Sequence, residues 1–180
     1  EYNGFANAKR IFGDVFLLLP YNKGRKRAAM YIKDCYREGV PALSLEIFPP
    51  KKESAVEVVL DVVERVTATE PSFVSVTYGA SGNVERVKYS QLVATLIKNQ
   101  YDTEPLFHLT CVNSKREQIQ DLLSRLKKNN IQNILALQGD LPPGYAHENK
   151  DFCYAVDLIA AIRDYGGFCI GAACYPEGHI

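Results

Sequence analysis

The sequence lacks several features that define common classes of protein. It has no net charge, because 21 Lys and Arg residues balance 21 Asp and Glu residues among 180, and this argues against a nucleic-acid-binding protein, which usually has a basic excess. No apolar run reaches the roughly 18 residues of a membrane span, since the apolar stretch 11–20 is short and contains Asp14. It has no GxGxxG or Walker lysine motif, so neither a Rossmann nor a P-loop nucleotide site is indicated.

The cysteines do not form a recognisable framework. Their number is odd, no two make a CxxC pair, and they are Cys35, Cys111, Cys153, Cys169 and Cys174. We interpret them as reduced thiols in a reducing compartment, the cytoplasm first and an organellar matrix as the alternative. A metal site from Cys169, Cys174 and His179 is the sharper interpretation, but we predict no metal.

The composition that remains, 47% hydrophobic and 23% charged residues, is that of an ordinary globular domain. The chain divides into an N-terminal extension, 1–40, and a regular region, 41–180. The extension contains a basic cluster at 23–27 and is expected to form a helix over 23–38 that ends at Gly39. This helix has either a solvated face or a surface for docking a partner.

From residue 41 onward, strand and helix patterns alternate. Strands are predicted at 42–48, 73–78, 106–111, 133–138 and 168–175, and helices at 53–69, 84–100, 114–129 and 152–165. Ser114 and Glu117 have the spacing of a capping box for the third helix. About five strands and four helices in alternation predict an α/β fold with a parallel sheet.

One face of each strand becomes polar toward its carboxyl end. Because strand residues alternate between faces, we expect Leu135 and Leu137 to pack under helices, opposite Gln138. A doubly wound sheet is apolar on both faces, whereas a (β/α)₈ barrel carries its chemistry at the carboxyl ends of its strands. The sequence therefore favours a partial barrel whose mouth holds Glu46, Thr77, His108, Gln138 and Asp140.

Five motifs occur in order along this region: SLEIFPPK around Glu46, FVSVTYGA, HLTC, NILALQGDLPPG and ACYPEGH. Together they resemble the N-terminal part of the methylenetetrahydrofolate reductase family over roughly residues 41–179. The resemblance implies a partial (β/α)₈ barrel that binds FAD. It also implies reduction of 5,10-methylenetetrahydrofolate to 5-methyltetrahydrofolate with NAD(P)H, in one-carbon metabolism and methionine biosynthesis.

The resemblance also assigns roles to residues. It places the catalytic acid at Glu46, which would help to open the folate ring to an iminium, a role that burial at a partly apolar mouth favours. It places the flavin-side carboxylate at Asp140, whose charge would disfavour an anionic reduced flavin. The positions that match flavin contacts are Thr77, His108, Gln138, Asp140, Tyr175 and His179.

Two departures from the family pattern carry consequences. Gln138 stands where the family usually has arginine, and a neutral amide in place of a charged guanidinium is expected to weaken FAD binding or shift its potential. The sequence supplies about five strands where a complete barrel has eight. We therefore expect an oligomer, or a C-terminal half or partner chain that completes the barrel.

Two other functions stay open at this point. One is a non-catalytic relative that serves as a structural subunit of a larger complex. The other is a flavin-free barrel lyase or aldolase, which is disfavoured because no lysine stands at a strand end to form a Schiff base.

Overall fold

The computed structural model describes residues 9–12, 15–17, 31–50, 56–78, 84–141, 144 and 151–174. Its main feature is a five-stranded sheet in the order β3-β4-β5-β6-β7, in which every neighbouring pair is parallel. This confirms the predicted α/β class with about five parallel strands. The strands are β3 (Ser44–Ile47), β4 (Phe73–Val76), β5 (Pro105–Thr110), β6 (Asn133–Leu137) and β7 (Cys169–Ala172).

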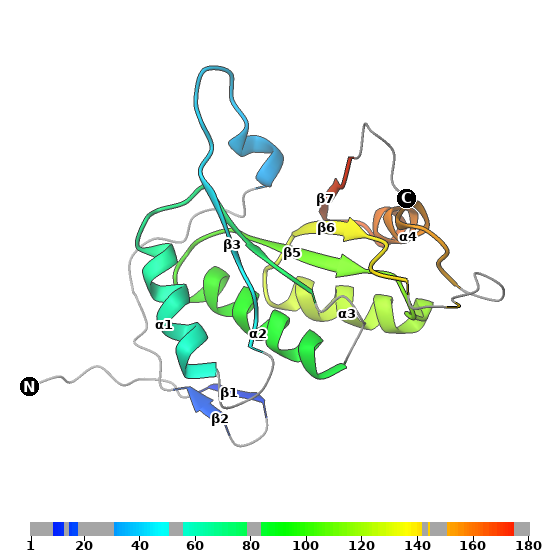
Figure 1. Cartoon of the computed structure of the whole chain (residues 1–180), viewed down its shortest axis with the longest axis horizontal. Helices are drawn as coiled ribbons and strands as arrows, with labels where there is room; N and C mark the ends of the chain where they lie inside the picture. Colours follow the sequence, from blue (N-terminus) through cyan, green and yellow to red (C-terminus); the bar gives the residue numbers. More distant parts are fainter. Residues whose placement is uncertain are drawn as a thin grey trace, which may run out of the picture.

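Four helices connect these strands. They are α1 (Val56–Thr67), α2 (Val84–Asn99), α3 (Arg116–Lys128) and α4 (Ala155–Tyr165). Crossovers between parallel strands are right-handed. Because each strand lies directly beside the previous one and always on the same side of it, all four helices lie on one face of the sheet. Figure 1 shows them succeeding one another along the sheet in the same order as the strands. This is the arrangement of part of a (β/α) barrel.

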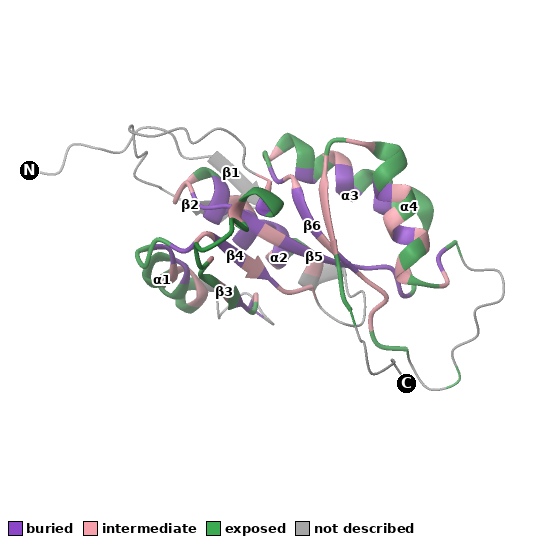
Figure 2. Cartoon of the chain, turned by 90° about the horizontal axis from the view of Figure 1, so that it is seen from above, coloured by how far each residue is buried: buried purple, intermediate pink, exposed green. Residues whose placement is uncertain are grey.

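The hydrophobic core lies between this helical layer and the sheet. Val74, Phe107 and Ile134 of the three central strands are fully buried there. Helix α3 contributes apolar residues at helical spacing, Ile119, Leu122, Leu123 and Leu126, so only its inner side is apolar. Figure 2 shows the result as buried central strands and exposed outer sides of α3 and α4. No helix in these described ranges is both long and apolar enough to cross a membrane.

The helix that we predicted over 23–38 is not continuous where it can be followed. Of that range, 23–30 lies outside the described residues, and the remainder forms a 3₁₀ helix, η1 (Ile32–Cys35), followed by a turn at Gly39 with φ of 73°. Farther upstream, β1 (Lys9–Phe12) pairs with β2 (Val15–Leu17) in an antiparallel hairpin, which the sequence analysis did not predict.

The remaining elements differ from the predictions mainly at their ends. The capping interaction of α3 is shifted by one residue, because the backbone N–H of Lys115 donates to Oε1 of Gln118 at 2.8 Å. The predicted Ser114 instead donates to the carbonyl of Thr110 at 3.5 Å. At the start of α4, the Asp157 carboxylate accepts two backbone N–H bonds, from Cys153 and Tyr154, each at 2.9 Å. Asp157 thus caps the amino end of α4, which begins at Ala155, three residues later than predicted.

The sheet has two outer strands. β3 and β7 each pair with one strand in the part of the chain that is described. Leu43 and Phe48, which flank β3 along the chain, are exposed apolar side chains, as are Val58 and Val62 of α1. An edge strand with exposed apolar neighbours is a surface that folded proteins usually cover.

Candidate active site

Three polar side chains from three neighbouring strands meet on the face of the sheet opposite the helices. Glu46 of β3 is in register with Ser75 of β4, and residues in register on parallel strands point to the same face. His108 of β5 joins them, because Ser75 Oγ lies 2.9 Å from His108 Nε2 and Glu46 Oε2 lies 3.7 Å from the same nitrogen. The structure thus brings together two of the predicted site residues and adds Ser75.

His108 and Glu46 differ in their exposure. The side chain of His108 is 11% exposed and that of Glu46 is 47% exposed. Burial lowers the pKa of His108 below its usual value of 6.5, and the Glu46 carboxylate opposes this by raising it. Because the pKa stays lowered on balance, the imidazole is neutral near pH 7. Glu46 itself is half exposed, which is less burial than we expected from the sequence.

Two threonines lie on the same face of their strands, farther toward the carboxyl ends. Thr77 directly follows β4, where its N–H donates to the carbonyl of Ile47 at 3.1 Å and its carbonyl accepts from Ser90 Oγ at 3.0 Å. Thr110 ends β5, and its Oγ1 is buried with no hydrogen-bond partner in the described structure. A buried hydroxyl without a partner costs free energy unless a ligand or water satisfies it.

The fourth strand of the series does not present its faces as predicted. Leu135 is in register with His108, and Leu137 is in register with Thr110, so both leucines belong to the Glu46 side, where they are half-buried. Ala136, by contrast, is fully buried toward the helices. The predicted orientation of β6 was therefore wrong, because a small alanine packs under helices as well as a leucine does.

Gln138 directs its side chain away from the meeting point of Glu46, Ser75 and His108. Its Nε2 donates to the carbonyl of Cys153 at 3.0 Å, in the segment that precedes α4. The amide therefore ties β6 to the start of the next helix. This contact uses one of the two N–H groups by which Gln138 would bind a ligand.

Gly139 interrupts the alternation after β6. Its φ is 90°, and a Cβ atom there would lie 2.7 Å from Val112 Cγ1 and 3.0 Å from Thr110 Cβ. Both the conformation and the space therefore require glycine. The following residue, Asp140, is exposed, and the strand period no longer fixes which way it faces.

The last two predicted contacts, Tyr175 and His179, lie outside the described residues. His179 is also the third member of the alternative metal site. Of the other two members of that site, Cys169 is half-buried in β7 and Cys174 is exposed, and all five cysteines are free. Within the described residues, no cluster of three or more His, Cys, Asp or Glu side chains has the arrangement of a metal site.

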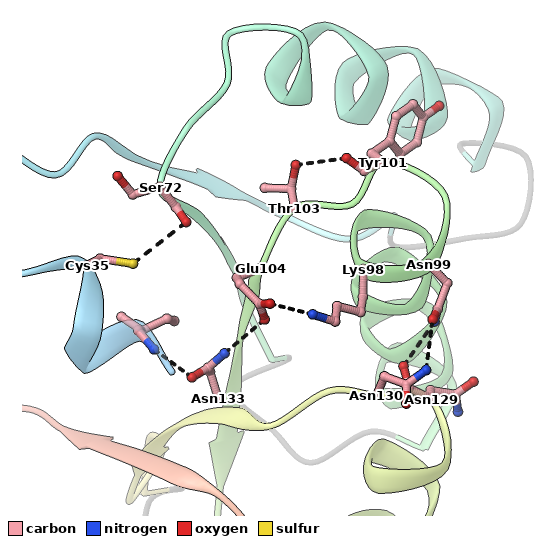
Figure 3. A network of polar contacts seen from close by, with 11 residues as sticks. Cys35, Ser72, Lys98, Asn99, Tyr101, Thr103, Glu104, Asn129, Asn130 and Asn133 are labelled. Atoms are coloured by element: carbon pink, nitrogen blue, oxygen red, sulfur yellow. Dashed lines mark hydrogen bonds and ion pairs between the residues drawn. The ribbon is translucent and has the colours of Figure 1, made fainter. Parts of the chain in front are cut away.

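The opposite end of the sheet holds a second polar cluster that the sequence analysis missed. At the amino ends of β5 and β6, Glu104 binds Lys98 through Oε1 and accepts from Asn133 Nδ2 through Oε2 at 3.2 Å. Asn133 Oδ1 in turn accepts from the backbone N–H of Ile32 at 2.9 Å. Figure 3 shows this chain of contacts linking α2, the sheet and η1. A polar residue immediately before a strand gives no sequence signal that distinguishes it from an ordinary loop residue.

Parallel strands with acid–base side chains on one face and helices on the other define a domain of the (β/α) barrel class, whose chemistry lies at the carboxyl ends of the strands. The fold and the Glu46–Ser75–His108 meeting point both agree with this class. Residues 31–180 match the family model described as methylenetetrahydrofolate reductase. The chain belongs to the methylenetetrahydrofolate reductase family.

Named relatives from plants and bacteria agree with this assignment. The chain is 40% identical over 147 residues to methylenetetrahydrofolate reductase (NADH) 1 of Zea mays. It is 36% identical over 137 residues to 5,10-methylenetetrahydrofolate reductase of Pectobacterium carotovorum, and 34% identical over 142 residues to that of Escherichia coli. The matches cover 79%, 76% and 79% of this chain, but only 24%, 44% and 46% of the three relatives. The chain thus spans less than half of the length of each.

Proposed function

We propose that this chain forms the N-terminal part of a flavin-dependent barrel that reduces 5,10-methylenetetrahydrofolate to 5-methyltetrahydrofolate with NAD(P)H. The observation that carries the proposal is the convergence of Glu46 and His108 on one face, with Glu46 Oε2 3.7 Å from His108 Nε2. The relatives are named as methylenetetrahydrofolate reductases, and the maize name adds NADH, which supports this substrate and a nicotinamide donor.

Several features of this face fit FAD. Leu135 and Leu137 offer an apolar surface that is half-buried, which suits a planar aromatic ring. The buried Thr110 Oγ1 is without a protein partner in the described structure and is available to bind a polar edge. We assign Thr77, His108, Gln138, Asp140, Tyr175 and His179 as the flavin contacts, with Gln138 contributing through the N–H that its bond to Cys153 leaves over.

Glu46 is the proposed general acid. Its carboxyl group donates a proton to the folate nitrogen that leaves the methylene carbon, which opens the five-membered ring to an iminium. Its half-exposed position allows contact with a bound substrate. The bound flavin would supply the hydride equivalent that reduces this carbon. Asp140, exposed just after β6, is assigned as the carboxylate whose charge disfavours negative charge on the bound cofactor.

The first experiment asks whether the full-length protein binds FAD. We expect a visible flavin absorbance band, either in the protein as purified or after incubation with FAD. A protein that stays colourless after FAD is added contradicts the proposal.

The second experiment replaces the acid. Glu46→Gln removes the proton but keeps the shape, so folate reduction should fall about 10²- to 10⁴-fold, while reduction of the flavin by NAD(P)H stays largely intact. Glu57→Gln, on the exposed side of α1, is the matched control and should leave both rates unchanged. Loss of both half-reactions in Glu46→Gln would contradict the role assigned to Glu46.

A non-catalytic structural subunit is the second candidate, and two observations favour it. Gln138 replaces a cation expected at the flavin site and binds the Cys153 carbonyl, and the β3 edge carries exposed apolar side chains. In this case a C-terminal half, a partner chain or another copy covers the open edges. The protein would then be soluble only together with that partner, and a stable, monodisperse monomer without flavin or partner would eliminate this candidate.

A further inference from the structure

Ser75 makes the shortest polar contact at the proposed site, and no role is yet assigned to it. In a Ser–His–acid triad, serine and acid bind opposite nitrogens of the imidazole. Here, Ser75 Oγ at 2.9 Å and Glu46 Oε2 at 3.7 Å approach the same nitrogen, Nε2 of His108. The two side chains therefore compete for one position, and the serine holds it.

The chemistry of this nitrogen explains what the competition decides. In a neutral imidazole, Nε2 either donates or accepts one hydrogen bond, and a serine hydroxyl serves as the partner in both cases. As long as Ser75 occupies Nε2, the 3.7 Å separation leaves Glu46 outside hydrogen-bond distance. An ion pair between Glu46 and a protonated His108 would instead hold the glutamate as a carboxylate, which has no proton to give.

We propose that Ser75 is a positioning residue whose hydroxyl occupies Nε2 of His108, prevents an ion pair between His108 and Glu46, and so keeps the Glu46 carboxyl free to carry the proton used in folate reduction. The proposal rests on the proposed function in one respect, the role of Glu46 as the acid.

The surroundings of His108 support this role. Its register neighbour on β6 is the apolar Leu135, and Glu46 on β3 is the charged group that acts on it among the described residues. Without the serine hydroxyl, Nε2 would be a buried nitrogen with no close partner, which is unfavourable. The Glu46 carboxylate, 3.7 Å from Nε2, then becomes the partner of this nitrogen, and its negative charge favours the protonated form of the imidazole.

The test removes and restores the hydroxyl in the full-length protein. Ser75→Ala should raise the pKa of His108, measured by NMR of ¹⁵N-labelled histidine and assigned by loss of the signal in His108→Asn. Pairing with a protonated His108 holds Glu46 as a carboxylate and reduces the fraction of Glu46 that carries the catalytic proton. Because one pKa unit corresponds to a tenfold change in such a fraction, we expect kcat for folate reduction to fall about tenfold, with KM and flavin reduction unchanged. Ser75→Thr, which retains the hydroxyl, should restore both the pKa and kcat. Ser72→Ala, just before the amino end of the same strand, is the matched control and should change neither.

A double variant identifies the partner of His108. In Ser75→Ala with Glu46→Gln, the rise in the pKa of His108 should disappear, because no carboxylate remains to pair with it. An unchanged His108 titration in Ser75→Ala overturns the proposal, even if Glu46→Gln abolishes folate reduction. If Ser75→Ala shifts the titration but Glu46→Gln leaves folate reduction intact, the competition for Nε2 is supported, whereas the proposed function and the catalytic part of this inference fail.

Discussion

Replacing Glu104 with glutamine tests how much the polar cluster at the amino ends of the strands stabilises the fold. The side chains of Lys98 and Glu104 are only 8% and 6% exposed, so water does little to screen their interaction. The carboxylate accepts from two donors, Lys98 Nζ and Asn133 Nδ2. A glutamine amide has one acceptor and one donor end, so one of these two partners would face another donor.

The expected cost follows from this arrangement. Glu104→Gln leaves the Lys98 ammonium buried without a counter-charge, and breaking a buried pair in this way destabilises by about 3–5 kcal/mol. In a domain of this size, about 1 kcal/mol lowers Tm by about 2–4 °C, so Tm should fall by about 6–20 °C. Urea unfolding followed by circular dichroism measures the free energy of unfolding directly.

A double variant separates charge burial from packing. Lys98→Met together with Glu104→Leu removes both charges and keeps the apolar volume, so it should cost less than Glu104→Gln alone, although Asn133 still loses a partner. A loss below about 1 kcal/mol for Glu104→Gln, the range of an exposed pair, would refute the reasoning.

Three further predictions concern other parts of the chain. Gly139→Ala should destabilise by about 1–3 kcal/mol, measured by urea unfolding, because its φ is 90° and the new Cβ would lie 2.7 Å from Val112 Cγ1; an unchanged free energy of unfolding would contradict this geometry. Asp157→Ala should cost about 0.5–2 kcal/mol in the same assay, since two backbone N–H groups before α4 lose their acceptor, whereas Asp157→Asn, which keeps an acceptor, should cost less. Burial raises the pKa of Cys111 to about 11, so at pH 8 its thiol stays protonated and should react with iodoacetamide far more slowly than the exposed Cys174, as peptide mass spectrometry would measure; equal rates would contradict it.

The alternation of elements was predictable from the sequence because the strands are short apolar runs and the helices carry apolar residues at helical spacing, as in α3. Helix ends were harder to predict, because several side chains near an end can serve as a cap. Gln118 rather than Glu117 supplies the contact at α3, and Asp157 supplies it at α4.

The candidate site was predictable in part. Glu46 and His108 alternate with apolar neighbours, so the strand period placed them on one face, and the structure brings them together. The same rule failed at β6, where residues 134–137 are all apolar and the period carries no information about which face is buried. The bond from Gln138 to Cys153 and the Ser75 contact depend on how neighbouring strands and loops meet in space, which no local pattern encodes.

The spatial order of the parallel strands is also their order along the chain, and this affects how the domain folds. Each new strand adds to the one made just before it, so the sheet can lengthen unit by unit during synthesis, without waiting for distant segments. Each newly made strand thus becomes the edge strand on one side of the sheet, while β3 remains the edge strand on the other side.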